Sequence, residues 1–99
     1  MTRHLKTINH YLDAAKARHK LPSDYALAKK LKVGGSHISN YRSGRSHPDD
    51  AMAVHLARLL GIGPLEIIAA AHYHRASRLD DSEGKKLWKQ VYKDAVRNK

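Results

Sequence analysis

Cysteine is absent from this 99-residue chain, and both acidic residues and long apolar runs are scarce. Without cysteine the chain can form no disulfide bond and has no thiolate for catalysis or metal binding. The longest uninterrupted apolar run is the five residues Ile67 to Ala71, whereas a membrane-spanning helix needs about 20. His, Lys, Asn and Asp interrupt the first 20 residues, so they contain no signal-peptide core. We therefore expect a soluble, cytoplasmic protein with no membrane partner.

The scarcity of acidic residues leaves a large positive charge. Nineteen Lys and Arg stand against nine Asp and Glu, which gives a formal net charge of +10. Hydrophobic residues make up 41% of the chain, which is enough for a single domain with one modest core. A folded basic domain of this size suits a polyanionic partner, nucleic acid before an acidic membrane or protein. The alternative is that the charge only keeps the chain in solution.

Histidine is plentiful, with eight residues, but its spacing argues against a metal site. No two histidines are four residues apart, and His72 and His74 point to different sides of a helix. The acidic pairs at 49–50 and 80–81 stand where helices are expected to begin, so helix capping explains them better than acid/base catalysis. We predict no metal, no cofactor, no small-molecule ligand and no enzymatic activity.

The apolar residues recur with helical spacing along the whole chain, and no stretch alternates as a strand would. We expect helices over roughly residues 2–19, from the N-cap Ser23 to Leu31, over 35–43, from Asp49-Asp50 to Gly61, from Gly63-Pro64 onward, and over 80–97, where Asp80 and Glu83 are spaced as a capping box. The expected inward faces are Leu5, Ile8, Leu12 and Ala15; Leu27, Ala28 and Leu31; Ala53, Leu56, Ala57 and Leu60; and Leu65, Ile68 and Ala71. The apolar side of the last helix is Leu87, Trp88, Val91, Tyr92 and Ala95. The prediction is an all-α fold.

Residues 35–43 have an unusual composition for a helix. Ile38 and Tyr41 share one side, and the opposite side carries Ser36, Asn40 and Ser43, flanked by His37 and Ser39. A solvated helix face usually carries Lys and Glu, which form helices better than Ser or Asn. Short hydrogen-bonding side chains near Arg42 and Arg45 match the reading of base edges with phosphate anchoring. The alternative is a poorly formed polar turn.

A resemblance to a known family covers residues 23–62, which read SDYALAKKLKVGGSHISNYRSGRSHPDDAMAVHLARLLGI. This segment resembles the helix-turn-helix of the Cro/CI phage-repressor family, also called XRE, at Leu27-Ala28, Leu31, Val33, Ile38-Ser39, Gly44, Pro48, Leu56, Leu60 and Gly61. The resemblance implies a five-helix lambda-repressor-like DNA-binding domain over residues 1–76, with the helix-turn-helix at about 23–43. Residues 77–99 would add a C-terminal helix, a possible dimerisation element.

The resemblance also implies a mode of binding to double-stranded DNA, with the helix that follows Ser23 across the backbone and helix 35–43 in the major groove. The family's base-contacting positions fall on Gly35, Ser36, His37, Ser39 and Asn40. Asn40 is the strongest candidate, because an amide can bond adenine through both its oxygen and its nitrogen. The expected phosphate contacts are Ser23, Arg42, Ser43 and Arg45.

Four residues depart from the family pattern, and one of them is Gly34, which stands where the family usually has Ser or Thr at the helix cap. Lys32 stands where the family usually has Gly, and since a left-handed Lys costs roughly 1–2 kcal/mol, we expect the turn to shift towards Gly34-Gly35. Asp24 replaces a residue that is often Gln near a phosphate, and we expect it only to cap its helix. Arg42 replaces a frequent Glu, so we expect the usual ion pair within the motif to be absent.

These observations favour a sequence-specific DNA-binding transcriptional regulator, a phage or mobile-element repressor that binds its operator as a homodimer. The alternative is an antitoxin-like module that holds a protein partner through residues 75–99. For the dimer interface two surfaces stay open: the fifth helix around Ile67 and Ile68, and the last helix with Leu87, Trp88, Val91 and Tyr92. The last helix could instead fold back over its own core.

Overall fold

The computed structural model describes residues 5–97, and over these residues every regular element is a helix, as the sequence predicts. The helices are α1 (Ile8–Arg18), α2 (Asp24–Leu31), α3 (Gly35–Ser43), α4 (Asp50–Leu60), α5 (Pro64–Arg78) and α6 (Ser82–Arg97). Within the described range no helix is long and apolar enough to span a bilayer.

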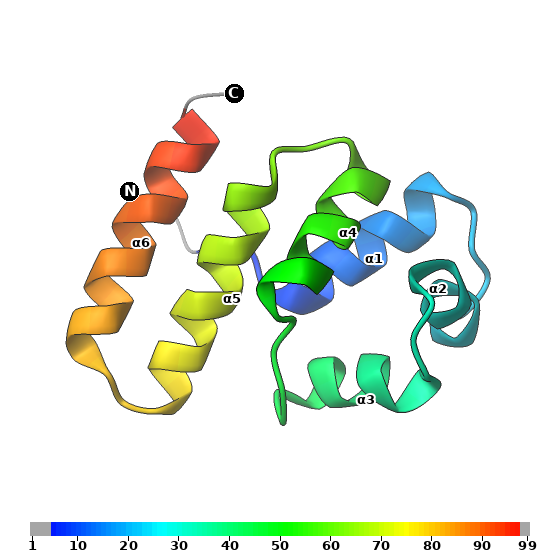
Figure 1. The fold of residues 1–99 in the computed structure, drawn as a ribbon, viewed down its shortest axis with the longest axis horizontal. Coiled ribbons are helices and arrows are strands. Elements are labelled where there is room, and N and C mark those ends of the chain that lie inside the picture. Colours follow the sequence, from blue (N-terminus) through cyan, green and yellow to red (C-terminus); the bar gives the residue numbers. More distant parts are fainter. Residues whose placement is uncertain (1–4, 98–99) are drawn as a thin grey trace.

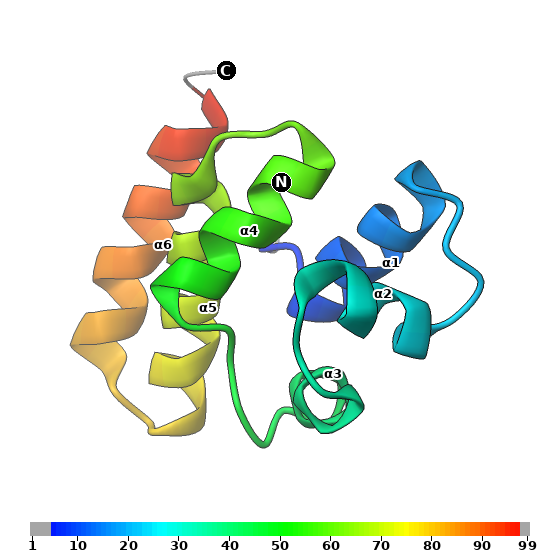
Figure 2. The ribbon, with the colours of Figure 1, turned by 45° about the vertical axis from the view of Figure 1, so that its right-hand side comes forward.

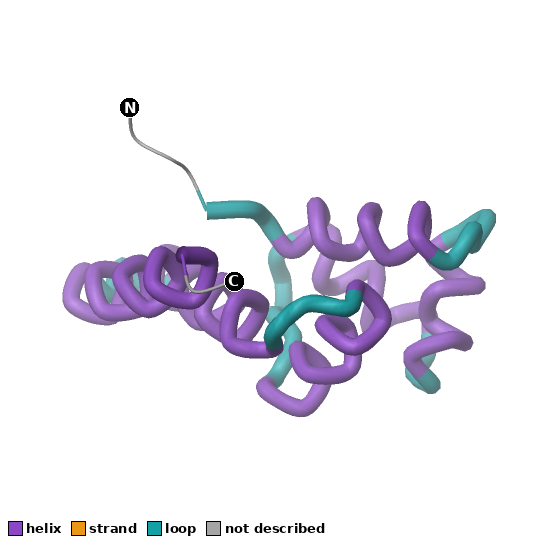
Figure 3. The backbone as a smooth tube through the Cα atoms, turned by 90° about the horizontal axis from the view of Figure 1, so that it is seen from above, coloured by secondary structure: helices purple, strands orange, loops and turns teal. Residues whose placement is uncertain are grey.

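The helices form two groups that share one core. α5 and α6 run antiparallel, side by side, at the left of Figure 1, and α2 lies at the opposite side of the molecule. α1 and α4 lie between them, and α3 runs along the lower edge. The rotated view in Figure 2 shows α3 end-on at the base. From above, Figure 3 shows the α5–α6 pair at one end of the long axis. α3 is therefore covered by other helices on one side only.

Local capping residues set the ends of the middle helices. The Ser23 hydroxyl oxygen accepts a hydrogen bond from the Ala26 amide at 3.1 Å, and the Asp49 carboxylate accepts one from the Met52 amide at 2.8 Å. Gly61 ends α4 with a φ of 69°, in the left-handed region that glycine adopts without strain. These boundaries confirm the prediction that Ser23 caps α2 and that α4 runs from Asp49-Asp50 to Gly61.

Two predicted helix starts are wrong. α1 begins at Ile8, because Thr7 takes an extended conformation and its hydroxyl oxygen accepts from the His10 amide at 3.1 Å. Residues 5–7 thus precede the helix, and the earlier part of the predicted span lies outside the described residues. At α6, Asp80 has a φ of 60° and does not cap the helix. Asp81 accepts from the Gly84 amide at 3.0 Å in its place.

The core confirms most of the predicted inward faces, and α5 is the exception. The buried residues include Leu5, Ile8, Leu12, Ala15, Leu27, Ala28, Leu31, Ala53, Leu56 and Ala57, and Leu60 is half-buried. In α5, however, Leu65 is 47% exposed while Ile67 is fully buried. α5 packs against α4 on one side and α6 on another, so its buried surface is wider than one stripe and is rotated from the predicted face.

The inner side of α6 completes this core, so α6 folds back over its own chain. Tyr92 is 8% exposed, and its hydroxyl lies 3.1 Å from that of Tyr11, which donates to Glu66 at 2.7 Å. Burial raises the pKa of Tyr11 well above its usual range, which keeps the hydroxyl protonated as a donor. Ile67 and Tyr92 are thus interior residues of the single chain, and a dimer interface that includes them stays a prediction. Leu87 remains 58% exposed.

Candidate nucleic-acid interface

The turn between α2 and α3 is closed by Lys32 in a left-handed conformation, with φ 61° and ψ 43°. The Lys32 amide donates to the Lys29 carbonyl at 3.1 Å, and the Val33 amide donates to the Ala28 carbonyl at 3.0 Å. These bonds satisfy carbonyls at the end of α2, which offsets the conformational cost of a left-handed lysine. Gly34 is extended and precedes α3. The expected shift of the turn towards Gly34-Gly35 is therefore wrong, and α3 begins at Gly35.

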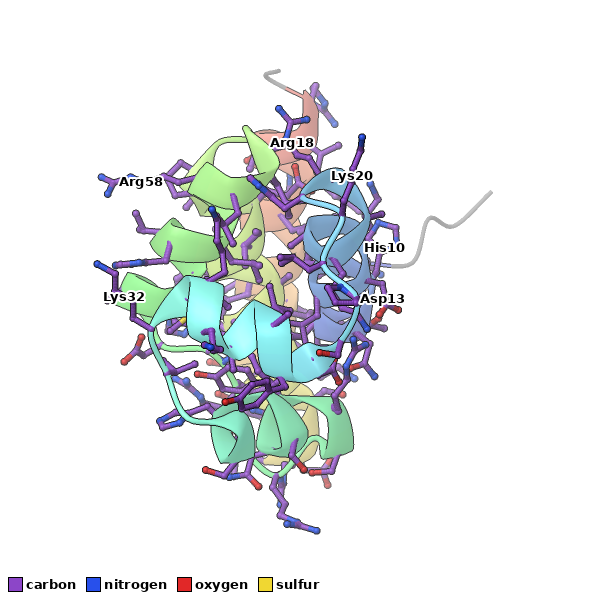
Figure 4. All side chains as sticks on the ribbon, turned by 90° about the vertical axis from the view of Figure 1, so that its right-hand side faces the viewer. His10, Asp13, Arg18, Lys20, Lys32 and Arg58 are labelled. Carbon is purple, nitrogen blue, oxygen red and sulfur yellow. The ribbon has the colours of Figure 1, made fainter. Side chains whose placement is uncertain are left out.

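α3 has one buried side and one bare side, as its composition predicts. Ile38 is fully buried and Tyr41 is half-buried against the core. The predicted base-contacting residues Gly35, Ser36, His37 and Ser39 are exposed, and Asn40 is half-buried. In Figure 4, α3 crosses the base of the molecule below α2, and its outer side chains extend away from the other helices. The structure thus places the candidate base-reading residues together on an open surface.

Three of the predicted contact residues meet where α3 ends. The Arg45 guanidinium donates to the Asn40 side-chain oxygen at 3.4 Å, and the Ser43 hydroxyl donates to the Asn40 carbonyl at 3.2 Å. Gly44 follows with a φ of 80° and turns the chain towards α4. Asn40 is therefore held by its neighbours, with its amide nitrogen available for a further hydrogen bond.

Arg42 makes an ion pair inside the motif, so the expectation that this pair is absent is wrong. Its Nε donates to Asp24 Oδ2 at 3.2 Å, and its Nη2 donates to Asp24 Oδ1 at 2.9 Å. The same Nη2 donates to Asp13 Oδ1 at 2.7 Å. Lys16 also lies 3.1 Å from Asp24. Asp24 therefore does more than stand at the start of α2: it joins α2 to α1 and α3.

The charges in this cluster support one another. The hydrogen bonds from Arg42 hold the pKa values of Asp13 and Asp24 below their usual range, and those carboxylates raise the pKa of Arg42. A phosphate contact by Arg42 stays a prediction, although its guanidinium is already occupied by carboxylates. Opposite charges in the two motif helices were a signal for the Asp24 pair. Asp13 was missed because it lies 29 residues from Arg42 in the sequence.

The remaining predicted contact, Ser23, is half-buried at the N-terminus of α2, where its oxygen caps the helix. The first amides of a helix favour an anion, and this position is compatible with a phosphate. Across residues 5–97 no three potential metal ligands come together.

Comparison with known proteins agrees with this geometry. A family model described as a helix-turn-helix matches residues 23–67, a segment that runs from the cap of α2 into α5. Searches of curated proteins and of solved structures found no significant match to the chain.

Proposed function

We propose that the chain is a sequence-specific repressor whose helix α3 reads the major groove. The proposal starts from residues 23–67, a helix-turn-helix of the Cro/CI (XRE) type, which makes the chain a DNA-binding transcription regulator. The observation that carries this proposal is the outer face of α3. It exposes short hydrogen-bonding side chains, whereas its inner face is anchored by the fully buried Ile38.

The side chains on this face suit the two kinds of contact that specific DNA binding needs. Ser36, His37, Ser39 and Asn40 can bond base edges, and Asn40 can bond adenine bidentately. Arg45 and Ser43 lie at the end of the same helix, where phosphate contacts would fix its position along the groove. Base reading and positioning are thus divided between the start and the end of α3.

The repressor acts as a homodimer on a phage or mobile-element operator in this proposal. One helix-turn-helix reads few base pairs, and dimers gain specificity from two half-sites about 34–36 Å apart. The exposed side of α6 around Leu87 supports a contact with a second copy, because a large aliphatic side chain there is 58% exposed. Residues 1–76 would then bind DNA, and residues 77–99 would join the protomers.

The test is selection of duplexes from a random pool, followed by a salt titration of the selected sequence. We expect a recurrent two-fold-symmetric sequence, with an affinity that falls steeply between about 50 and 200 mM salt because bound phosphates release counterions. Enrichment of no sequence, together with an affinity that salt leaves unchanged, would overturn the proposal. Binding to a protein partner without binding to any duplex would favour the antitoxin-like alternative.

A further inference from the structure

A second group of basic residues lies next to α3 but belongs to other elements. His47 is in the loop between α3 and α4, and His74, Arg75 and Arg78 are in the last part of α5. In Figure 1 the C-terminal end of α5 and the helix α3 lie at the same lower end of the molecule. We call these four residues the α5 basic cluster.

A direct contact ties the α5 basic cluster to the recognition helix. The Arg78 guanidinium donates a hydrogen bond to the carbonyl of Gly44, the left-handed residue that ends α3. His47 and His74 also line one open cleft of about 250 Å³, together with Tyr41 and Ser43 of α3. The end of α5 is therefore held at a fixed place beside the surface that the proposed function assigns to DNA.

The α5 basic cluster is not neutralised within the protein, in contrast to Arg42. Burial, and after it the nearby charges of Arg75, His74 and Arg78, hold the pKa of His47 below its usual value. Among residues 5–97 the ion pairs engage Asp13 and Asp24 with Arg42 and Lys16, and Asp50 with His72. Gathering like charges costs stability unless an external anion binds them. This arrangement is typical of a binding surface for a polyanion.

We propose that the α5 basic cluster binds the phosphate backbone beside the base pairs that α3 reads, so that the DNA interface extends beyond the helix-turn-helix to the end of α5. This inference rests on the proposed function. The cluster makes no base contact in this scheme. It raises affinity for every sequence alike and fixes the angle of the domain on the duplex.

The test compares a double variant, Arg75→Gln with Arg78→Gln, with a control that removes two charges elsewhere. The control is Lys20→Gln with Arg58→Gln, because Figure 4 shows both residues at the end of the molecule opposite α3. Anisotropy titrations use one duplex that ends at the selected site and one with flanks of random sequence, each at several salt concentrations.

On the flanked duplex, the double variant should lower the slope of log affinity against log salt by about 4, since each protomer of the proposed dimer loses two phosphate contacts and each lost contact removes about 0.9. The base preference should not change. On the short duplex the variant and the wild type should bind alike. The control should match the wild type on both duplexes.

Two further variants separate charge from folding. Arg75→Gln alone keeps the contact between Arg78 and Gly44 and should lower the slope by about 2, one contact for each protomer of the proposed dimer. Arg78→Lys keeps the charge and should retain the wild-type slope. If the wild type binds normally and the double variant keeps the wild-type slope on the flanked duplex, the proposed role of the α5 basic cluster is overturned, but the proposed function is not. A wild type that binds neither duplex overturns the proposed function and this inference with it.

Discussion

Arg42 is a single side chain that connects three helices through charge. It lies in α3, bonds Asp24 at the start of α2 through two nitrogens, and bonds Asp13 in α1. Its side chain is 23% exposed, and those of Asp24 and Asp13 are 41% and 64% exposed. Solvent screens such a pair strongly, so its contribution comes from the bidentate geometry and from joining several elements.

Arg42→Gln should lower the free energy of unfolding by about 1 kcal/mol at neutral pH. Because Arg42 lowers the pKa values of Asp13 and Asp24 below the ordinary 3.8, this stabilisation is present above that pH and is lost as pH falls through the lowered values. Urea denaturation of the wild type and of Arg42→Gln, at pH 7 and at about pH 2, checks the direction of this pH dependence. A difference that persists unchanged in acid would mean that Arg42 acts through packing.

Asn40→Ala should weaken binding to the selected duplex by about 1–3 kcal/mol and relax the preference at one base pair. The helix should form as before, because Asn40 is on the outer side of α3. Anisotropy titrations check this on duplexes that carry each of the four base pairs in turn at each position of the selected site. The control is Arg45→Ala, which should weaken all sequences nearly alike. A variant that keeps its base preference would show that Asn40 does not read DNA.

At the scale of elements, the turn between α2 and α3 holds its geometry against a local conformational cost. Lys32 takes a left-handed conformation that a lysine adopts at roughly 1–2 kcal/mol. The hydrogen bonds that close α2 and the burial of Leu31 and Ile38 on either side of the turn outweigh that cost. The angle between the two motif helices is therefore set by packing rather than by the turn residue.

Lys32→Gly should raise the free energy of unfolding by roughly 0.5–1 kcal/mol, since it relieves the strain but adds freedom to the unfolded chain. Thermal unfolding without DNA measures this. Lys30→Gly is the matched control: it removes the same side chain inside α2 and should destabilise by about 1 kcal/mol. Destabilisation of equal size by both changes would mean that Lys32 is not strained.

The elements that the sequence predicts well are those whose ends depend on adjacent residues. Ser23, Asp49 and Gly61 act within one helical turn, and they place α2 and α4 correctly. The exposed face of α3 follows from the burial of Ile38, which helical periodicity alone predicts. The orientation of α5 depends on which helices cover it. That cover comes from α4 and α6, and no pattern within residues 64–78 predicts it.

The features of the candidate site also divide into those that the sequence predicts and those that it does not. The bare residues of α3 share one helix, so their common face could be derived from spacing. The partners of Arg42 and the α5 basic cluster come from distant segments, and only the packing of the helices brings them together. The opposite charges of Asp24 and Arg42 were visible in the sequence, but the pairing of Arg42 with Asp13 and the accumulation of positive charge near His47 were not.

For the whole molecule, the proposed contact with a second copy lies on the outer side of α6. Leu87→Glu should shift the proposed homodimer towards monomer by about 2 kcal/mol, because a buried interface would have to accept an unpaired charge. Light scattering over a range of concentrations measures the change. Leu65→Glu makes the same substitution on α5, where the side chain is 47% exposed. Dissociation by this second variant and not the first would move the interface to α5.

The contact between Tyr11 and Tyr92 joins residues that are 81 positions apart. Chains leave the ribosome from their N-terminus, and local helices such as α2 and α3 can form while synthesis continues. The buried network at Tyr11, however, waits for the last helix to emerge. A nascent chain stalled before Tyr92 should thus remain sensitive to protease, and the finished core should close only after synthesis has passed α6. Emergence of α6 from the ribosome, rather than formation of α2 and α3, would then set the time at which the whole domain is folded.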